Sequence, residues 1–167
     1  MVELSKDNYR AAILVCSDRA HSGQRPDSSG SVIAQRLQEL GWAVSNPAVF
    51  PDDLAAIAEW LRMQAQNGEH DLILTTGGTG LSTRDVTPEA TLGVIERRVP
   101  GIEEAMRVHS MKVTPHAMLS RSVAGVSGHC LIVNLPGSPK GALENLNAIL
   151  PALPHAIQLL RGKTPDP

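Results

Sequence analysis

The sequence predicts a three-layer α/β/α domain with a mostly parallel sheet and one antiparallel hairpin. Short unbroken apolar runs are typical of strands buried on both faces. Between them lie segments with helical spacing of apolar residues, and two β-rich runs flank a glycine-containing turn. Strands and helices that alternate in this way favour a layered α/β architecture. The 167 residues show no repeat or linker, and we expect one domain, residues 1–167, with its core at about 11–161.

The first half of the chain predicts three strands and two helices. The apolar run AAILVC predicts a buried strand, and the three residues after it predict a polar loop. Ile33, Leu37 and Leu40 recur at helical spacing before Gly41, which is typical of a helix end. The expected elements are strands at 11–16, 42–50 and 72–76, a helix that ends at Gly41, and a helix from 54 to 65 that stops near Gly68.

The second half predicts a hairpin and several helices. Thr87 fits a helix N-cap and Pro88 the first helical position, so we expect a helix that runs to about residue 98. Ser127-Gly128-His129 separates two β-rich runs and predicts the turn of the hairpin. The other elements are an amphipathic helix at about 102–113, hairpin strands at 122–126 and 130–135, helices at 142–153 and 154–161, and a loose tail after residue 162.

The composition argues against nucleic-acid and membrane partners. Fifteen Lys and Arg residues against seventeen Asp and Glu give a net charge of -2, without the basic patch that nucleic acid requires. Two Trp, one Tyr and one Phe are too few for a base-stacking surface. No apolar run approaches the roughly 20 residues of a membrane helix, and the first residues lack the core of a signal peptide. We expect a cytoplasmic protein that binds a small molecule or another protein.

The two cysteines and six histidines do not indicate thiol or zinc chemistry. Cys16 and Cys130 lie in apolar strand-like runs, so buried free thiols are favoured over a disulfide. The histidines lack the short pair spacings of a zinc site. Ligands of parallel sheets bind beyond the carboxyl ends of the strands. This rule selects the loops at 17–19, 51–53, 77–85 and 136–140.

A glycine-rich segment, Thr76-Gly77-Gly78-Thr79-Gly80, begins at the end of the third predicted strand. Small residues and hydroxyls directly after a strand let backbone N–H groups approach anionic oxygens, as in a phosphate cradle. The segment is not a P-loop, because no Lys-Ser or Lys-Thr pair follows it. It also fails the dinucleotide fingerprint, because Thr83 stands in the place of the third glycine. The alternative is a tight strand-to-helix turn without a ligand.

Asp52 and Asp85 are the candidate metal ligands. Asp85 is not needed as a helix cap if Thr87 caps the helix that follows it. Either Asp52 or Asp53 could cap the helix after Pro51, so a capping role for Asp52 stays open. Two carboxylates at one edge of a sheet could hold Mg²⁺ together with water and substrate phosphates.

Two further polar positions leave a binding role and a surface role open. Lys140 follows two prolines before a predicted helix, where an ammonium group and the positive end of a helix would suit an anion. The alternative is a solvated lysine, as most surface lysines are. Ser120-Arg121 is either a polar surface turn or a contact to substrate.

Taken in order, these loops resemble the molybdopterin adenylyltransferase family of the MogA/MoaB type, which includes the G domain of gephyrin. The resemblance spans about residues 13–161, and the block after the third strand is highly specific. The matching strings are SD at 17–18, PD at 51–52, TTGGTG at 75–80, RDVTPEAT at 84–91, LSR at 119–121, NLPGS at 134–138 and ILPALPHA at 149–156.

The resemblance implies a cytoplasmic homotrimer that uses Mg-ATP to adenylylate molybdopterin, with release of pyrophosphate, before a molybdenum-insertion protein acts. It implies metal-binding and catalytic roles for Asp52 and Asp85. It also implies contacts with the pterin phosphate or the nucleotide for these residues: Ser17, Asp18, Thr76, Gly77, Gly78, Thr79, Gly80, Ser120, Pro136, Gly137, Ser138 and Lys140.

Two other classes of function stay open at this point. One is a non-catalytic molybdopterin-binding or scaffolding protein of the MoaB type, which would keep the glycine segment and Lys140 without turning over ATP. The other is a nucleotide-binding regulatory domain that does not bind a pterin. The presence of both Asp52 and Asp85 favours the enzyme.

Overall fold

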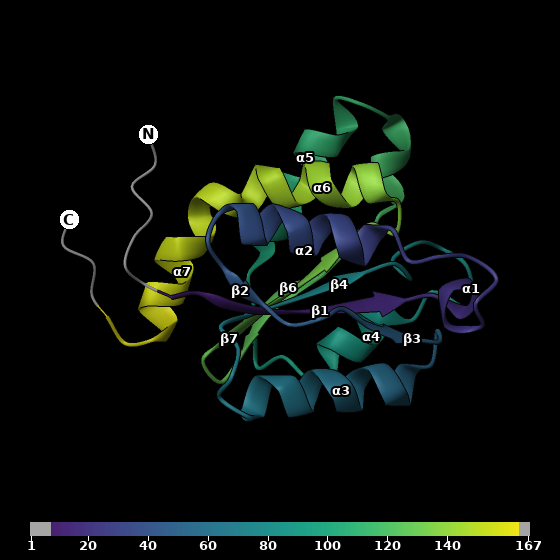
Figure 1. Ribbon diagram of the computed structural model, residues 1–167. Coiled ribbons are helices and arrows are strands. Elements are labelled where there is room, and N and C mark those ends of the chain that lie inside the picture. Colours follow the sequence, from purple (N-terminus) through teal and green to yellow (C-terminus); the bar gives the residue numbers. More distant parts are fainter. Residues whose placement is uncertain (1–7, 164–167) are drawn as a thin grey trace.

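The computed structural model describes residues 8–163, and a seven-stranded sheet forms its central layer (Figure 1). The strand order is β2-β1-β4-β7-β6-β5, and β3 also pairs with β1. All pairings are parallel except β7 with β6 and β6 with β5, which confirms the mostly parallel sheet with its hairpin. The strands are β1 (Arg10–Cys16), β2 (Ala43–Val44), β3 (Ala48–Phe50), β4 (Leu72–Thr76), β5 (Arg97–Arg98), β6 (Ala124–Ser127) and β7 (Cys130–Leu135).

Helices cover both faces of the sheet, so the three-layer prediction is confirmed. Figure 1 shows α2, α5 and α6 on one face and α3 and α4 on the other. Leu153 and Ile157 of α7 pack into the core on the α2 side. Within residues 8–163, no helix combines the length and the apolar character needed to cross a membrane. The helices are α1 (Asp18–His21), α2 (Ser29–Glu39), α3 (Leu54–Gln66), α4 (Thr87–Leu92), α5 (Pro100–Met111), η1 (Pro115–Leu119), α6 (Pro139–Ile149), η2 (Leu150–Ala152) and α7 (Leu153–Leu160).

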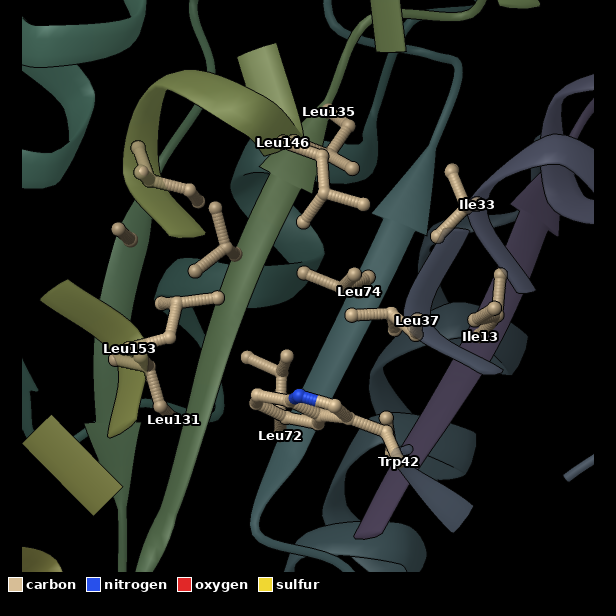
Figure 2. Close-up of a cluster of buried hydrophobic side chains, with 14 of the residues drawn as sticks. Ile13, Ile33, Leu37, Trp42, Leu72, Leu74, Leu131, Leu135, Leu146 and Leu153 are labelled. Atoms are coloured by element: carbon tan, nitrogen blue, oxygen red, sulfur yellow. The ribbon is translucent and has the colours of Figure 1, made fainter. Parts of the chain in front are cut away.

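The core has two parts because side chains alternate between the faces of each strand. In β4, Leu72 and Leu74 point toward α2, α6 and α7, where they pack with residues such as Leu37 and Leu146 (Figure 2). The neighbouring Ile73 packs on the other face. Both faces of the central strands are therefore buried, as the unbroken apolar runs indicate. Burial of each such Leu or Ile contributes about 1.5–3 kcal/mol, and this rigid sheet fixes the loops at its edge.

The helix expected from Thr87 to about residue 98 is shorter than predicted. It ends at Leu92, and residues 97–98 form the edge strand β5, which pairs with β6. Backbone bonds from Glu96 N to Val126 O and from Val99 N to Ala124 O extend this pairing. Pairing with a strand almost thirty residues further along the chain overrides the local preference, and no local pattern could have shown it.

Three other boundaries differ from the predictions. Residues 18–21 form the short helix α1 instead of part of a loop, because Ser17 Oγ accepts a hydrogen bond from Ala20 N. The strand expected at 42–50 is split into β2 and β3 around Pro47, which has no N–H for a ladder. At the end of the chain, α6 begins at Pro139, earlier than expected, and η2 separates it from α7. The loose tail expected after residue 162 lies mostly outside the described residues.

Candidate functional site

The carboxyl ends of β1, β3, β4 and β7 lie at one edge of the sheet, where the sequence places the candidate loops. A pocket of about 310 Å³ opens there, and we call it the carboxylate pocket after the aspartates in its wall. The sequence-predicted residues that line it are Ser17, Asp52, Thr76, Gly77, Gly78, Asp85, Gly137 and Ser138. Residues from four separate loops therefore meet in one place.

The glycine segment packs closely against neighbouring residues, and Gly77 and Gly78 leave no room for a side chain. Gly77 has φ +97°, and a Cβ atom there would lie 2.3 Å from the carbonyl oxygen of Cys16 in β1. At Gly78, with φ +66°, a Cβ atom would lie 2.3 Å from Thr87 Oγ1 and 3.1 Å from Asp52 Oδ1. Side chains rarely adopt such φ values, and here they would also displace backbone or site atoms.

Thr87 fixes the glycine segment and does not cap α4 as predicted. Its hydroxyl is fully buried and donates to the carbonyl oxygen of Gly77 at 2.9 Å. Its backbone N–H donates to Gly78 O at 3.2 Å, and the residue in the N-cap position, Val86, makes no side-chain cap. The threonine before the proline thus holds the turn between β4 and α4 in its left-handed conformation.

The backbone N–H groups of Gly78, Thr79 and Gly80 are available to a ligand. Among the hydrogen bonds of residues 8–163, none has one of these three groups as its donor. Backbone N–H groups are obligatory donors, and a run of them in a turn forms a concavity that attracts anions. The phosphate-cradle interpretation has the donors that it needs.

Asp52 is held in place by Asp18, and the capping role belongs to its neighbour. Asp53 Oδ1 accepts from Ala56 N at 2.8 Å and is the N-cap of α3. Asp52 Oδ2 accepts from Asp18 N at 3.1 Å, and Asp52 N donates to Asp18 Oδ1 at 3.0 Å. Arg84 donates twice to the Asp18 carboxylate, at 2.9 and 3.0 Å. Asp18 thus orients Asp52 but does not itself line the pocket.

The second carboxylate oxygen of Asp52 is buried and has no hydrogen-bond partner among the described residues. Burial, together with repulsion from the Asp18 and Asp85 carboxylates, raises the pKa of Asp52, although the hydrogen bond from Asp18 N opposes this shift. A buried acceptor without a partner is costly. A cation in the pocket would relieve both the missing contact and the charge repulsion.

Asp52 and Asp85 would be the carboxylate ligands of a magnesium ion bound in this pocket. Asp85 Oδ2 accepts from Ser82 N at 3.1 Å, and Asp85 Oδ1 accepts no hydrogen bond from the described residues. Asp27 also lines the pocket and was missed by the sequence analysis; its Oδ1 accepts a hydrogen bond from Gly30 N at the start of α2. In residues 8–163, no three His, Cys, Asp or Glu side chains form a ready metal cage. Water and phosphate oxygens would complete the coordination, as Mg²⁺ commonly requires.

A second pocket of about 300 Å³ adjoins the first, and Ser138 lines both. We call it the α5–α6 pocket because residues of these two helices form much of its wall. Besides Ser138, four predicted residues line it: Thr79, Gly80, Ser120 and Pro136. The sequence analysis missed its other polar residues, among them Arg107, Ser110, His116 and Asn145. The predicted binding residues are therefore divided between two neighbouring pockets.

Lys140 lines neither pocket. It lies in the first turn of α6 with its side chain 78% exposed, and its nearest acidic partner is Glu144, at 3.9 Å. An exposed pair of this kind contributes little to stability. The structure leaves the side chain free to reach an anion near the start of α6, and its binding role stays a prediction.

Both cysteines are free and buried, as predicted. Cys16 lies in the wall of the carboxylate pocket, where burial raises the pKa of its thiol to about 12, Thr87 opposes the rise and the nearby Asp52 charge adds to it. Since a thiolate is the reactive form, this thiol is inert at neutral pH. The chemistry of the pocket therefore belongs to its carboxylates and backbone groups.

A larger pocket, about 470 Å³, lies at the opposite edge of the sheet. Its central acid, Asp71, is buried and accepts hydrogen bonds from both Arg10 and Arg161. Burial favours a higher pKa for Asp71, but these arginine bonds prevail and lower it. The charges are already paired, so this pocket is a structural ion-pair network at the base of the strands.

Comparison with known proteins bears on both pockets at the carboxyl ends of the strands. The family described as a probable molybdopterin binding domain matches residues 12–155. The chain belongs to this family. The match covers every loop that contributes a predicted residue to the carboxylate pocket and the α5–α6 pocket.

Several relatives of this molybdopterin-binding family member are similar over most of the chain. A molybdopterin adenylyltransferase of Helicobacter pylori is 41% identical over 155 residues, covering 90% of this chain and 86% of the relative. Gephyrin of Dictyostelium discoideum is 42% identical, but the chain spans only 23% of its length. The solved structure of the molybdopterin biosynthesis enzyme MoaB from Thermus thermophilus has a TM-score of 0.87 at 48% identity, covering 93% of this chain and 98% of that one.

Proposed function

We propose that the protein transfers the adenylyl group of ATP to molybdopterin in the biosynthesis of the molybdenum cofactor. The observation that carries the proposal is the pair of adjoining pockets joined at Ser138. One offers carboxylates and the free backbone N–H group of Gly78, which suit a metal-bound triphosphate. The other offers hydroxyl, amide and guanidinium groups, which suit a polar pterin and its phosphate. Relatives of similar length named molybdopterin adenylyltransferase support the same activity.

In the proposed reaction, a phosphate oxygen of molybdopterin attacks the α-phosphorus of ATP. The bond from this phosphorus to the oxygen of the β-phosphate breaks, and pyrophosphate leaves with the electron pair. Asp52 and Asp85 would hold Mg²⁺, which when bound supplies positive charge to the triphosphate oxygens. The backbone N–H groups of the glycine segment would orient the phosphates, because such transfers depend on positioning and charge neutralisation.

The test is an assay of pyrophosphate release by the purified chain with ATP and molybdopterin across a Mg²⁺ titration. Release that requires both molybdopterin and the cation is the expected result. Reactions without molybdopterin or with a chelator are the controls. Tight molybdopterin binding without release would instead identify the non-catalytic class, and absence of pterin binding would favour a nucleotide-binding regulatory domain. The homotrimer, the molybdenum-insertion partner and the cytoplasmic location stay predictions.

Lys140 provides a prediction about the anionic part of the substrate. Replacement of Lys140 by alanine is expected to weaken molybdopterin binding about fivefold at low salt, as loss of ~1 kcal/mol of attraction across water implies. The loss should shrink at high salt, since an exposed charge is screened, and unfolding should change little. Titration of molybdopterin at two ionic strengths measures this. Lys112→Ala is the matched control, because Lys112 is exposed at the end of α5. Equal effects of the two variants would mean that Lys140 is a solvated surface lysine with no binding role.

A further inference from the structure

Arg121 binds three parts of the segment between β4 and α4. Its backbone N–H donates to Thr79 O at 2.9 Å. Its guanidinium donates from Nε to Gly80 O at 2.7 Å and from Nη2 to Asp85 O at 2.7 Å, and Nη1 pairs with the Glu89 carboxylate in α4. All three nitrogens of the group are thus used inside the protein, and the side chain is only 33% exposed.

These bonds add to the other supports of this loop, which are its own turn bonds between Ser82 and Asp85 and the bonds from Arg84 to Asp18. Residues 81–84, between the two carbonyl groups that Arg121 binds, are all exposed and lie outside helices and strands. Asp85 is the residue at the end of this loop, and it lines the carboxylate pocket. A rigid guanidinium fork that spans Gly80 O and Asp85 O fixes the two ends of the loop relative to each other.

Arg121 also connects the two pockets. The α5–α6 pocket is lined by Thr79, Gly80 and Ser120, the residue before Arg121. Asp85 lines the carboxylate pocket. We propose that Arg121 is a positioning residue that sets the Asp85 carboxylate relative to a substrate in the α5–α6 pocket. The inference rests on the proposed function and deepens it. Arg121 acts through Asp85: each of its three guanidinium nitrogens donates to a protein acceptor, and the residue lines neither pocket.

The choice of arginine follows from this geometry. A lysine has one ammonium group on a flexible stem and cannot reach two carbonyls and a carboxylate in a fixed planar arrangement. Glu89 contacts the guanidinium but lines neither pocket, so the variant Glu89→Gln separates the ion pair from the bonds to the loop carbonyls.

The experiment compares Arg121→Ala, Arg121→Lys and Glu89→Gln in the full chain. For Arg121→Ala we expect a rate about 100-fold lower, the loss that a misplacement near 1 Å produces, and a higher Mg²⁺ concentration at half-maximal rate. Molybdopterin affinity should stay within threefold. Arg121→Lys should recover little of the lost rate. Added methylguanidinium should restore part of the rate to the alanine variant. Glu89→Gln should stay within threefold of the native rate.

A second readout does not depend on turnover. Amide hydrogen exchange of residues 81–85 should become faster in both Arg121 variants and stay near native in Glu89→Gln, and binding of Mn²⁺ alone should weaken only in the Arg121 variants. Native Mn²⁺ binding and exchange in Arg121→Ala, or losses as large in Glu89→Gln, would overturn the inference. If the native chain itself releases no pyrophosphate, the proposed enzyme fails, and these two measurements still decide the role of Arg121.

Discussion

Replacement of Asp52 or Asp85 by asparagine is expected to lower adenylyl transfer by about 100- to 1,000-fold, the usual loss when one preorganised electrostatic group is removed. Asparagine keeps the shape of the side chain and an oxygen for the bonds from Asp18 N and Ser82 N. It removes the negative charge that a cation beside the triphosphate requires. Initial rates of pyrophosphate release across a Mg²⁺ titration measure the effect.

The same exchange at Asp52 is expected to stabilise the protein in the absence of a metal. Burial raises the pKa of Asp52, so its charged form is less favourable in the folded chain than in the unfolded chain. The destabilising contribution is present at neutral pH, above the raised pKa, and disappears as the pH falls and the carboxyl is protonated. Asp52→Asn should therefore raise the free energy of unfolding at pH 7, within the roughly 0.5–2 kcal/mol typical of a single stabilising substitution.

Asp53→Asn is the matched control for both measurements. Asp53 is adjacent in sequence but caps α3, and asparagine caps a helix about as well as aspartate. Its rate and its stability should stay near native. Thermal unfolding at pH 7 and at acidic pH checks the direction of the stability change. The stability gained by Asp52→Asn should be smaller in acid. Native rates in both Asp52→Asn and Asp85→Asn would favour the non-catalytic binding protein.

The sequence was sufficient for the parts of the fold that are set by continuous patterns. The runs at 11–16, 72–76 and 130–135 became the central strands because each is long enough to bury both faces. The two residues of β5 are too short for any periodicity and depend on β6. Thr87-Pro88 matches a helix start locally, but the buried position of Thr87 makes Gly77 O its partner.

The residues of the candidate site could likewise be predicted only in part from the sequence. Loops after strands identified Asp52 and Asp85, but two adjacent aspartates fit one N-cap equally well, and only the bond from Ala56 N to Asp53 separates them. Ser110 and Asn145 are polar residues on α5 and α6 that look like parts of solvated helix faces. They form a hydrogen bond of 2.8 Å beside the α5–α6 pocket. Their role appears only when the two helices pack, which no local motif records.

Gly77→Ala is expected to destabilise the protein more than any other single methyl addition that we consider. A Cβ atom at Gly77 would lie 2.3 Å from Cys16 O, which belongs to a central strand and cannot move without disturbing the sheet. The left-handed backbone adds about 1–2 kcal/mol. Strain and overpacking together predict that the free energy of unfolding falls by about 4 kcal/mol or more, and the proposed phosphate cradle would be disrupted with the turn.

Gly128→Ala separates these two causes. Gly128 also has a left-handed backbone, with φ +58°, but a Cβ atom there would have nothing within 4 Å. Its cost should be only the ~1–2 kcal/mol of backbone strain. At about 2–4 °C per kcal/mol for a chain of this size, the unfolding temperature should fall by roughly 2–8 °C in Gly128→Ala and at least twice as far in Gly77→Ala. Equal falls in the two variants would mean that backbone conformation alone requires Gly77, because the close approach to β1 would then contribute nothing.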